Sequence, residues 1–310
     1  MILSRTDIRA LDRLIVIAGP TAAGKTALAL DLAEQVDGEV INADALQLYR
    51  GMDIGTAKLP VDQRRGIPHH LFDILEITET ATVASYQVQA RTLVTEILAR
   101  GRTPILVGGS GLYLQSVVDE LEFPGTDPLV RSRLEAELES EGARALHRRL
   151  TTLDPVAAAN IEPLNGRKVV RALEVLEVTG RPFSAYMPVR GPFRYRARWF
   201  CVDRDTVELD QRIDTRVHHM VEEGLLEEVA ELDRRGLRRG VTASRALGYQ
   251  QMLDVIDGNL TVEEAVAATI AGTRRYVRRQ RSWFRRDQRQ IWLDAAAPDL
   301  LDQVLRASRD

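Results

Sequence analysis

The first third of the chain switches between two patterns of apolar residues. Continuous apolar runs, typical of buried strands, occur in "RLIVIA", "GEVINAD" and "TPILVGG". Between them, apolar residues recur at helical spacing in "KTALALDLAEQV" and in "VASYQVQARTLVTEILARG", which we expect to end at Gly101. Strands that alternate with helices predict an α/β fold with a parallel sheet.

The middle of the chain is helical and rich in charge. Val130, Leu134 and Leu138 form one apolar stripe, and Asp154-Pro155 is a typical helix start. The strand-like "RWFCVD" then returns the chain to the sheet. We therefore predict three segments: core residues 1–122, an inserted helical domain at 123–198, and a second core part at 199–310.

In the last third of the chain, the sequence pattern predicts helices that are interrupted at glycines. Thr261 and Glu264 form a capping box for a long helix that we expect to run to about Arg286. "QIWLD" reads as a final short strand.

Composition limits the function classes. The net charge is −3 with 45% hydrophobic and 28% charged residues, so a polyanion would need a local basic patch. The single cysteine, Cys201, excludes an intrachain disulfide, and no Cys/His cluster has zinc spacing. The apolar runs are too short to cross a bilayer and the first residues lack a signal-peptide pattern, so we expect a cytoplasmic protein without membrane contact.

A phosphate-binding loop follows the first strand. "GPTAAGKT" matches G-x-x-x-x-G-K-[ST], and a strand precedes it and a helix follows it, which is the context that the motif requires. Backbone N–H groups and the helix N-terminus would hold phosphate, Lys25 would add charge, and the Thr26 hydroxyl would hold Mg²⁺. The predicted nucleotide- or diphosphate-binding residues are Gly19, Pro20, Thr21, Ala22, Ala23, Gly24, Lys25 and Thr26. The fold we expect is P-loop NTPase-like.

Two polar residues follow other strands of this predicted sheet. Asp44 ends the second strand, and Ser110 follows the third, which ends without the carboxylate usual in a P-loop ATPase. Both would lie at the edge where the loop opens, so Asp44 is a candidate general base and Ser110 a candidate positioning group. A helix cap or a metal ligand remains an alternative for Asp44, and a turn residue for Ser110. His69-His70 has no third metal ligand at useful spacing, so we interpret the pair as structural or substrate-lining.

The strongest local charge is "RRYVRRQRSWFRRDQRQ", which carries eight arginines against one aspartate. On a helix, an apolar stripe would dock it while a neighbouring stripe offers guanidinium groups to phosphates. The apolar stripe is Val266, Ile270, Val277 and Phe284, and the basic stripe is Arg274, Arg278, Arg281 and Arg285. The alternative is a solvated basic face paired with acidic neighbours.

Several segments together resemble the tRNA dimethylallyltransferase (tRNA isopentenyltransferase) family. They are "GPTAAGKT", "INADALQLYRGMDIGTAK", "PHHLFDI", "PILVGGSGLYL", "RALEVLEVTGRP", "LGYQQM" and "RRYVRRQRSWFRR", in this order between about residues 14 and 294. The resemblance implies transfer of the dimethylallyl group from dimethylallyl diphosphate to N6 of the adenosine 3′ of the anticodon. Diphosphate would leave from the P-loop with Mg²⁺, and the catalytic residues would be Asp44 as base, Ser110 and Lys25.

The resemblance also implies a set of tRNA contacts on the anticodon stem-loop. These are Asp44, Ala45, Leu46, Gln47, Ser110, Arg131, Arg167, Lys168, Val169, Val170, Arg171, Gly248, Tyr249 and Gln250, to which the basic helix adds Arg278 and Arg281. Ala45 departs from the family, which commonly has Ser there, so we expect at most a backbone contact. We expect a monomer.

Two other functions fit parts of the sequence. A P-loop kinase of small molecules or an isopentenyltransferase acting on free AMP would not need the helical insertion with its basic residues. A nucleotide-switched RNA-binding protein would need a metal-holding Asp at the end of the third strand, which the chain does not have there.

Overall fold

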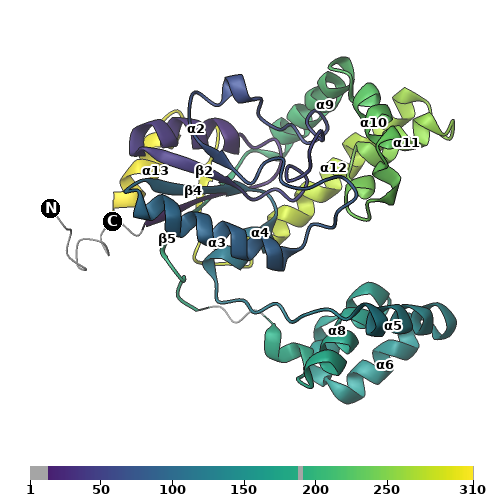
Figure 1. Ribbon diagram of the computed structural model, residues 1–310. Coiled ribbons are helices and arrows are strands. Elements are labelled where there is room, and N and C mark those ends of the chain that lie inside the picture. The colour runs from purple at the N-terminus through teal and green to yellow at the C-terminus, as the bar shows by residue number, and fades with distance from the viewer. Residues whose placement is uncertain (1–12, 188–190, 310) are drawn as a thin grey trace. The chain divides into compact units, whose positions relative to one another are not determined.

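The computed structural model describes residues 13–187 and 191–309, and its centre is a six-stranded parallel sheet in the order β3-β2-β4-β1-β5-β6 (Figure 1). The strands are β1 (Arg13–Ala18), β2 (Gly38–Asn42), β3 (His69–His70), β4 (Thr103–Gly108), β5 (Arg196–Asp203) and β6 (Ile291–Asp294). The predicted α/β class with a parallel sheet is confirmed. His70 bonds to the buried Glu39 at 2.6 Å.

Helices cover both faces of the sheet (Figure 1). On one face, α3 (Val83–Ala99) and α4 (Gly111–Val118) bury Val94 and Leu114 against the strands. On the other, α2 (Lys25–Val36), α9 (Thr206–Glu222) and α13 (Leu300–Arg309) bury residues such as Leu32 and Ile213. The central strands are apolar on both faces because helices cover them on both sides.

A third apolar cluster lies among α9, α10 (Leu225–Arg234), α11 (Tyr249–Ile256) and α12 (Val262–Phe284). The capping box of Thr261 and Glu264 is present, and α12 ends at Phe284, two residues before the expected Arg286. Single 3₁₀ turns cover Val61–Gln63, Leu237–Arg239 and Ala243–Arg245. In the described parts of the chain, no helix is both long and apolar enough to cross a membrane.

The described chain divides into two compact units, and the second is Asp119–Pro192. It contains α5 (Pro128–Glu141), α6 (Ala143–Leu153), α7 (Pro155–Asn160), α8 (Gly166–Thr179) and the 3₁₀ turn Phe183–Tyr186. Asp127, Asp154 and Asn165 cap three of these helices through their side chains. This unit overlaps the expected insertion at 123–198, whose last residues, from Arg196, belong to β5 in the first unit.

The first unit is interrupted at one point. The Arg194 N–H donates to the Val118 carbonyl at 2.7 Å, so the chain leaves this unit after Val118 and re-enters it beside the same residue. An insertion whose ends meet leaves the sheet intact, because no strand or helix of the first unit is cut.

Candidate active site and nucleic-acid contacts

The loops after β1, β2 and β4 meet at the carboxyl edge of the sheet. Since β4 lies between β1 and β2, the P-loop, Asp44 and the Gly109-Ser110 turn are neighbours there. All three line one cavity of about 400 Å³, which α9, α12 and residues 242–248 complete. A second cavity of about 370 Å³ shares Lys25 and Asp44 and extends past Thr26. The structure therefore brings the predicted chemical groups together.

The P-loop has the backbone geometry of an anion cradle. Gly19 has φ +146°, and a Cβ there would lie 2.2 Å from the Val202 carbonyl oxygen, so only glycine fits. Ala22, with φ +64°, and Gly24, with φ +104°, also take left-handed conformations. The Lys25 ammonium donates to the Pro20 carbonyl at 2.8 Å, which holds it over the loop. Successive N–H groups in such turns form a concave site for phosphate oxygens.

Asp44 is held by a turn two residues beyond β2. Asn42 accepts from the Asp44 N–H at 2.8 Å, and the Asn42 amide donates to the Asp44 and Leu71 carbonyls at 3.0 and 2.9 Å. The Asp44 carboxylate accepts from the Leu46 N–H at 3.0 Å. Burial raises the pKa of Asp44, opposed by the Leu46 N–H and the charge of Lys25. The carboxylate is therefore fixed in orientation and more basic than an ordinary aspartate, as a general base requires.

The pKa of Lys25 is shifted in the opposite direction from that of Asp44. Burial lowers its pKa to about 8, and the charge of Asp44 opposes that shift while the charge of Arg216 adds to it. An oppositely shifted acid and base in one cavity are a pattern found at functional sites.

Two arginines of α9 were missed by the sequence interpretation. Arg212 donates to the Ala22 carbonyl at 2.9 Å, and Arg216 reaches the Thr21 hydroxyl at 3.5 Å. Burial and the neighbouring Arg212 charge lower the pKa of Arg216. Like charges four residues apart repel on a helix, so the pair favours an anion between them and the P-loop. The sequence signal that could have found this pair is the i,i+4 spacing of Arg212 and Arg216 beside the apolar stripe of α9.

Ser110 meets residues of α12. Tyr276 lines the same cavity as Ser110 and Gln280. Burial, followed by the Asp44 charge, raises the Tyr276 pKa to about 12, and the Ser110 and Gln280 side chains oppose that rise. Gln280 in turn bonds to the P-loop and to Gly109. Nothing in the sequence pattern distinguished Tyr276 and Gln280 from other polar residues of a basic helix.

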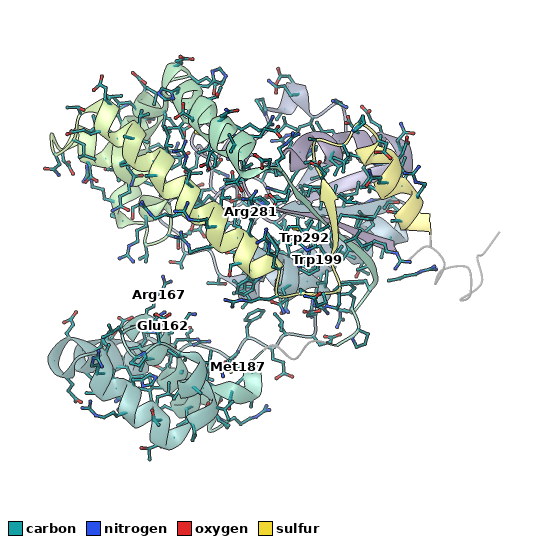
Figure 2. All side chains as sticks on the ribbon, turned by 180° about the vertical axis from the view of Figure 1, so that it is seen from behind. Glu162, Arg167, Met187, Trp199, Arg281 and Trp292 are labelled. Atoms are coloured by element: carbon teal, nitrogen blue, oxygen red, sulfur yellow. The ribbon has the colours of Figure 1, made fainter. Side chains whose placement is uncertain are left out.

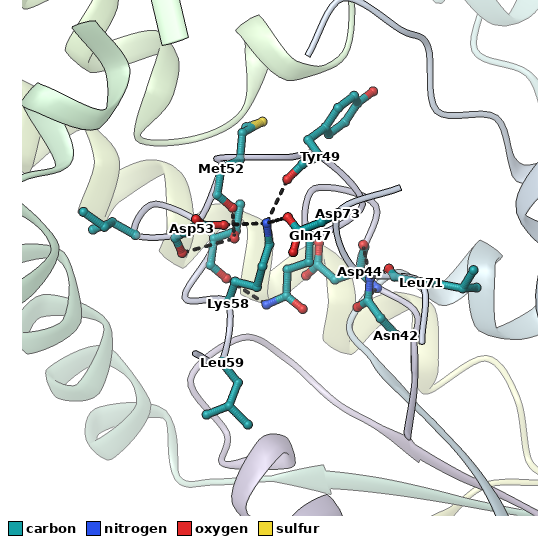
Figure 3. A network of polar contacts seen from close by, with 12 residues as sticks. Asn42, Asp44, Gln47, Tyr49, Met52, Asp53, Lys58, Leu59, Leu71 and Asp73 are labelled. Carbon is teal, nitrogen blue, oxygen red and sulfur yellow. Dashed lines mark hydrogen bonds and ion pairs between the residues drawn. The ribbon is translucent and has the colours of Figure 1, made fainter. Parts of the chain in front are cut away.

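The segment after Asp44 is braced by a buried lysine (Figure 3). Lys58 pairs with Asp53 and Asp73, both at 2.6 Å, and donates to the Tyr49 carbonyl at 2.8 Å. Gln47 donates to the Thr56 carbonyl at 3.0 Å. With Ala45 and Leu46, this segment lines the larger cavity, and these bonds within the protein hold its shape.

Tyr249, which the resemblance places among the tRNA contacts, is a core residue of the structure. Its ring is fully buried and its hydroxyl donates to Glu228 at 2.6 Å. Glu228 also accepts from the N–H groups of Asp53 and Ile54 at 3.1 and 2.8 Å. Gly248 is also buried, although it lines the cavity, and Gln250 is exposed.

The basic helix divides its arginines between two uses. The apolar stripe at Val266, Ile270, Val277 and Phe284 is buried as predicted. Arg281, labelled in Figure 2, pairs with Asp203 at 2.8 Å and donates to the Arg204 carbonyl and the Thr206 hydroxyl. Arg274 approaches Asp210 at 3.5 Å, whereas Arg278 is exposed. Arg281 thus has several of its donors in use inside the protein, and its contact with tRNA stays a prediction.

The helical unit also uses some of its arginines within the protein. Arg131 and Arg171 both pair with Glu174, which has no exposed surface, and Arg171 also donates to the Gly125 and Pro124 carbonyls. Val169 and Val170 are buried in the core of this unit. Of the expected cluster, Arg167 and Lys168 have exposed side chains at the start of α8, and Figure 2 labels Arg167.

Comparison with known proteins places this architecture in a family. The family model described as IPP transferase matches residues 47–287. The tRNA dimethylallyltransferase of Saccharopolyspora erythraea is 62% identical, with 94% of each chain covered. That of Salinispora tropica is 59% identical, with 94% of this chain and 92% of the relative covered.

Solved structures of similar proteins point to the same family. The full-length tRNA isopentenylpyrophosphate transferase of Bacillus halodurans has a TM-score of 0.70 at 41% identity, covering 96% of this chain and 94% of its own. A eukaryotic dimethylallyltransferase described as acting on tRNA has a TM-score of 0.80 at 27% identity, covering 95% of this chain and 77% of its own. The sheet, the P-loop with Asp44 at one cavity, and these relatives agree: the chain belongs to the tRNA dimethylallyltransferase family.

Proposed function

We propose that this chain transfers the dimethylallyl group from dimethylallyl diphosphate to N6 of the adenosine 3′ of the anticodon in tRNA. The observation that carries the proposal is the juxtaposition of an anion cradle with a basic carboxylate in one cavity. In this reaction the N6–C1 bond forms, the C1–O bond breaks, diphosphate takes the departing electron pair, and the N6 proton passes to the Asp44 carboxylate.

The diphosphate would lie on the P-loop. The N–H groups of residues 22–26, together with Lys25, Arg212 and Arg216, would supply the positive potential that stabilises charge on the leaving oxygen. Thr26 opens onto the same cavity, and its hydroxyl would be the protein ligand of Mg²⁺, whose other oxygen ligands would be phosphates and water. Bound Mg²⁺ would add further neutralisation of the leaving group.

The adenine would reach Asp44 from the side of the cavity lined by Leu46, Ser110 and Gly248. An anticodon-loop base must leave its stack to enter such a cavity, at a cost of a few kcal/mol. Ser110, which lines this cavity together with Tyr276, would orient the amine. Ala45 offers only backbone groups, and exposed Arg167, Lys168 and Arg278 would contact phosphates.

One assay separates this proposal from the two alternative hypotheses, an isopentenyltransferase acting on free AMP and a nucleotide-switched RNA-binding protein. The protein is incubated with Mg²⁺, radiolabelled dimethylallyl diphosphate and either tRNA or AMP, and the label is followed. We expect label on tRNA. Label on AMP alone favours a mononucleotide enzyme, and no label on either favours a protein without transfer chemistry.

Since one chain carries all these groups, we propose that a monomer suffices, acting in the cytoplasm on its tRNA substrate.

Asp44→Asn tests the assignment of the base. The substitution keeps the shape and the bond from the Leu46 N–H but removes the proton acceptor. We expect turnover to fall by about 10²–10⁴-fold, with tRNA affinity within about threefold of wild type. Turnover close to wild type would remove Asp44 from that role.

A further inference from the structure

Gln280 lies between the two loops that would hold the reacting groups. It projects from α12 and is only 5% exposed. Its Oε1 accepts from the Thr21 N–H of the P-loop at 3.1 Å, and its Nε2 donates to the Gly109 carbonyl at 2.9 Å. One side chain thus joins the loop after β1 to the loop after β4.

The position of Gln280 between the two loops requires an amide side chain. The Thr21 N–H needs an acceptor, and the Gly109 carbonyl needs a donor, so a buried side chain must present both. A glutamate carboxylate has no donor, and leucine has neither group. Gly109 is matched to this amide, because a Cβ at that position would lie 2.3 Å from the Gln280 Nε2.

The same face of α12 also carries Tyr276, four residues earlier, which lines the same cavity as Ser110 and Gln280. Through Gln280, the helix therefore holds the P-loop at the Thr21 N–H and the Gly109-Ser110 turn at the Gly109 carbonyl. Displacement at carbon requires nucleophile and leaving group at a defined separation, which these contacts control.

We propose that Gln280 is a positioning residue that sets the spacing between the P-loop and the Gly109-Ser110 turn. This inference rests on the proposed transfer reaction. Gln280 acts through the backbone of the two loops.

Gln280→Glu provides the test, because it preserves size and the acceptor but loses the donor at neutral pH. We expect kcat to fall by about 10- to 100-fold, the KM for tRNA to change by less than about threefold, and inorganic pyrophosphate to bind less tightly in calorimetry. Gln89→Glu, an exposed residue of α3, is the matched control for the added charge, and it should match wild type in all three measurements.

A pH series separates positioning from a general loss of structure. A protonated glutamate again has one acceptor and one donor, so the pyrophosphate affinity of Gln280→Glu relative to wild type should recover as pH falls. Gln280→Leu, which cannot titrate, should remain weak at every pH. A Gln280→Glu variant with wild-type kcat and pyrophosphate affinity, or one whose deficit is the same at every pH, would overturn the proposal.

Label transfer to tRNA distinguishes failure of the proposed function from failure of the positioning role. If wild-type protein transfers no label to tRNA, the proposed function is wrong, whatever Gln280 does. If wild type is active and the Gln280 variants are too, only the positioning role is wrong.

Discussion

At the scale of single residues, the site depends on two groups whose pKa values are shifted in opposite directions. Burial makes Asp44 harder to ionise and Lys25 easier to neutralise, and each partly offsets the other. The P-loop motif predicted Lys25, and the end of a strand predicted Asp44. The shifts themselves depend on the surrounding protein, including Arg216 from α9, and no local pattern encodes them.

These shifts predict a bell-shaped pH dependence of kcat/KM for dimethylallyl diphosphate. Asp44 must be ionised to accept a proton, so the acid limb should lie above the ordinary range of an aspartate because its pKa is raised. Lys25 must be protonated to hold diphosphate, so activity should fall as pH rises through about 8. Steady-state rates across this range measure both limbs.

Lys25→Arg identifies the alkaline limb. A guanidinium keeps its proton well above pH 10, so the variant, although slower, should lose the decline near pH 8. An unchanged decline in Lys25→Arg would assign that limb to another group.

At the scale of elements, α12 combines three roles on one helix. One face is buried in the core, a second reaches the two loops through Gln280, and a third exposes Arg278. Apolar periodicity predicted the first face correctly. It treated all the arginines alike, because helical spacing cannot show which arginine has an acidic partner on another element.

Arg278 and Arg281 should therefore respond differently to alanine substitution. Arg278→Ala should lower the dependence of tRNA affinity on salt by about 0.7–0.9 in the log–log slope. Arg281→Ala should leave that slope unchanged and lower the free energy of unfolding by about 2–4 kcal/mol, because Asp203 keeps a poorly solvated charge. Filter binding over a salt series and urea unfolding measure the two effects. A reduced slope in Arg281→Ala would return that residue to the RNA surface.

At the scale of the whole molecule, a helical unit is inserted into the α/β unit at a point where the residues before and after the insertion lie side by side. Each unit has its own apolar core, and the Arg194 N–H bond to Val118 closes the first unit. The change from apolar runs to charged helical stripes predicted the insertion. Its boundaries were harder to predict, since Phe193 packs with Trp199 only after folding.

Replacing Asp119–Pro192 by a short Gly-Ser linker should leave a folded first unit. We expect it to bind pyrophosphate with an affinity close to that of the full chain and to bind tRNA at least about tenfold more weakly, because the phosphate contacts proposed for Arg167 and Lys168 are lost. Calorimetry with pyrophosphate and filter binding with tRNA make the comparison. Unchanged tRNA affinity would assign recognition to the first unit alone.

The sequence by itself determined the phosphate loop, the candidate base and the main strands and helices, though not the two-residue strand β3, because periodicity, caps and glycine turns are set by neighbours along the chain. Only the tertiary structure decided which polar groups are partners. Gln280 lies 259 residues from Thr21, Arg281 lies 78 residues from Asp203, and Arg131 lies 43 residues from Glu174. Burial and pairing of a charge depend on such distant contacts, so the sequence could not show that several residues expected to bind RNA also have partners within the protein.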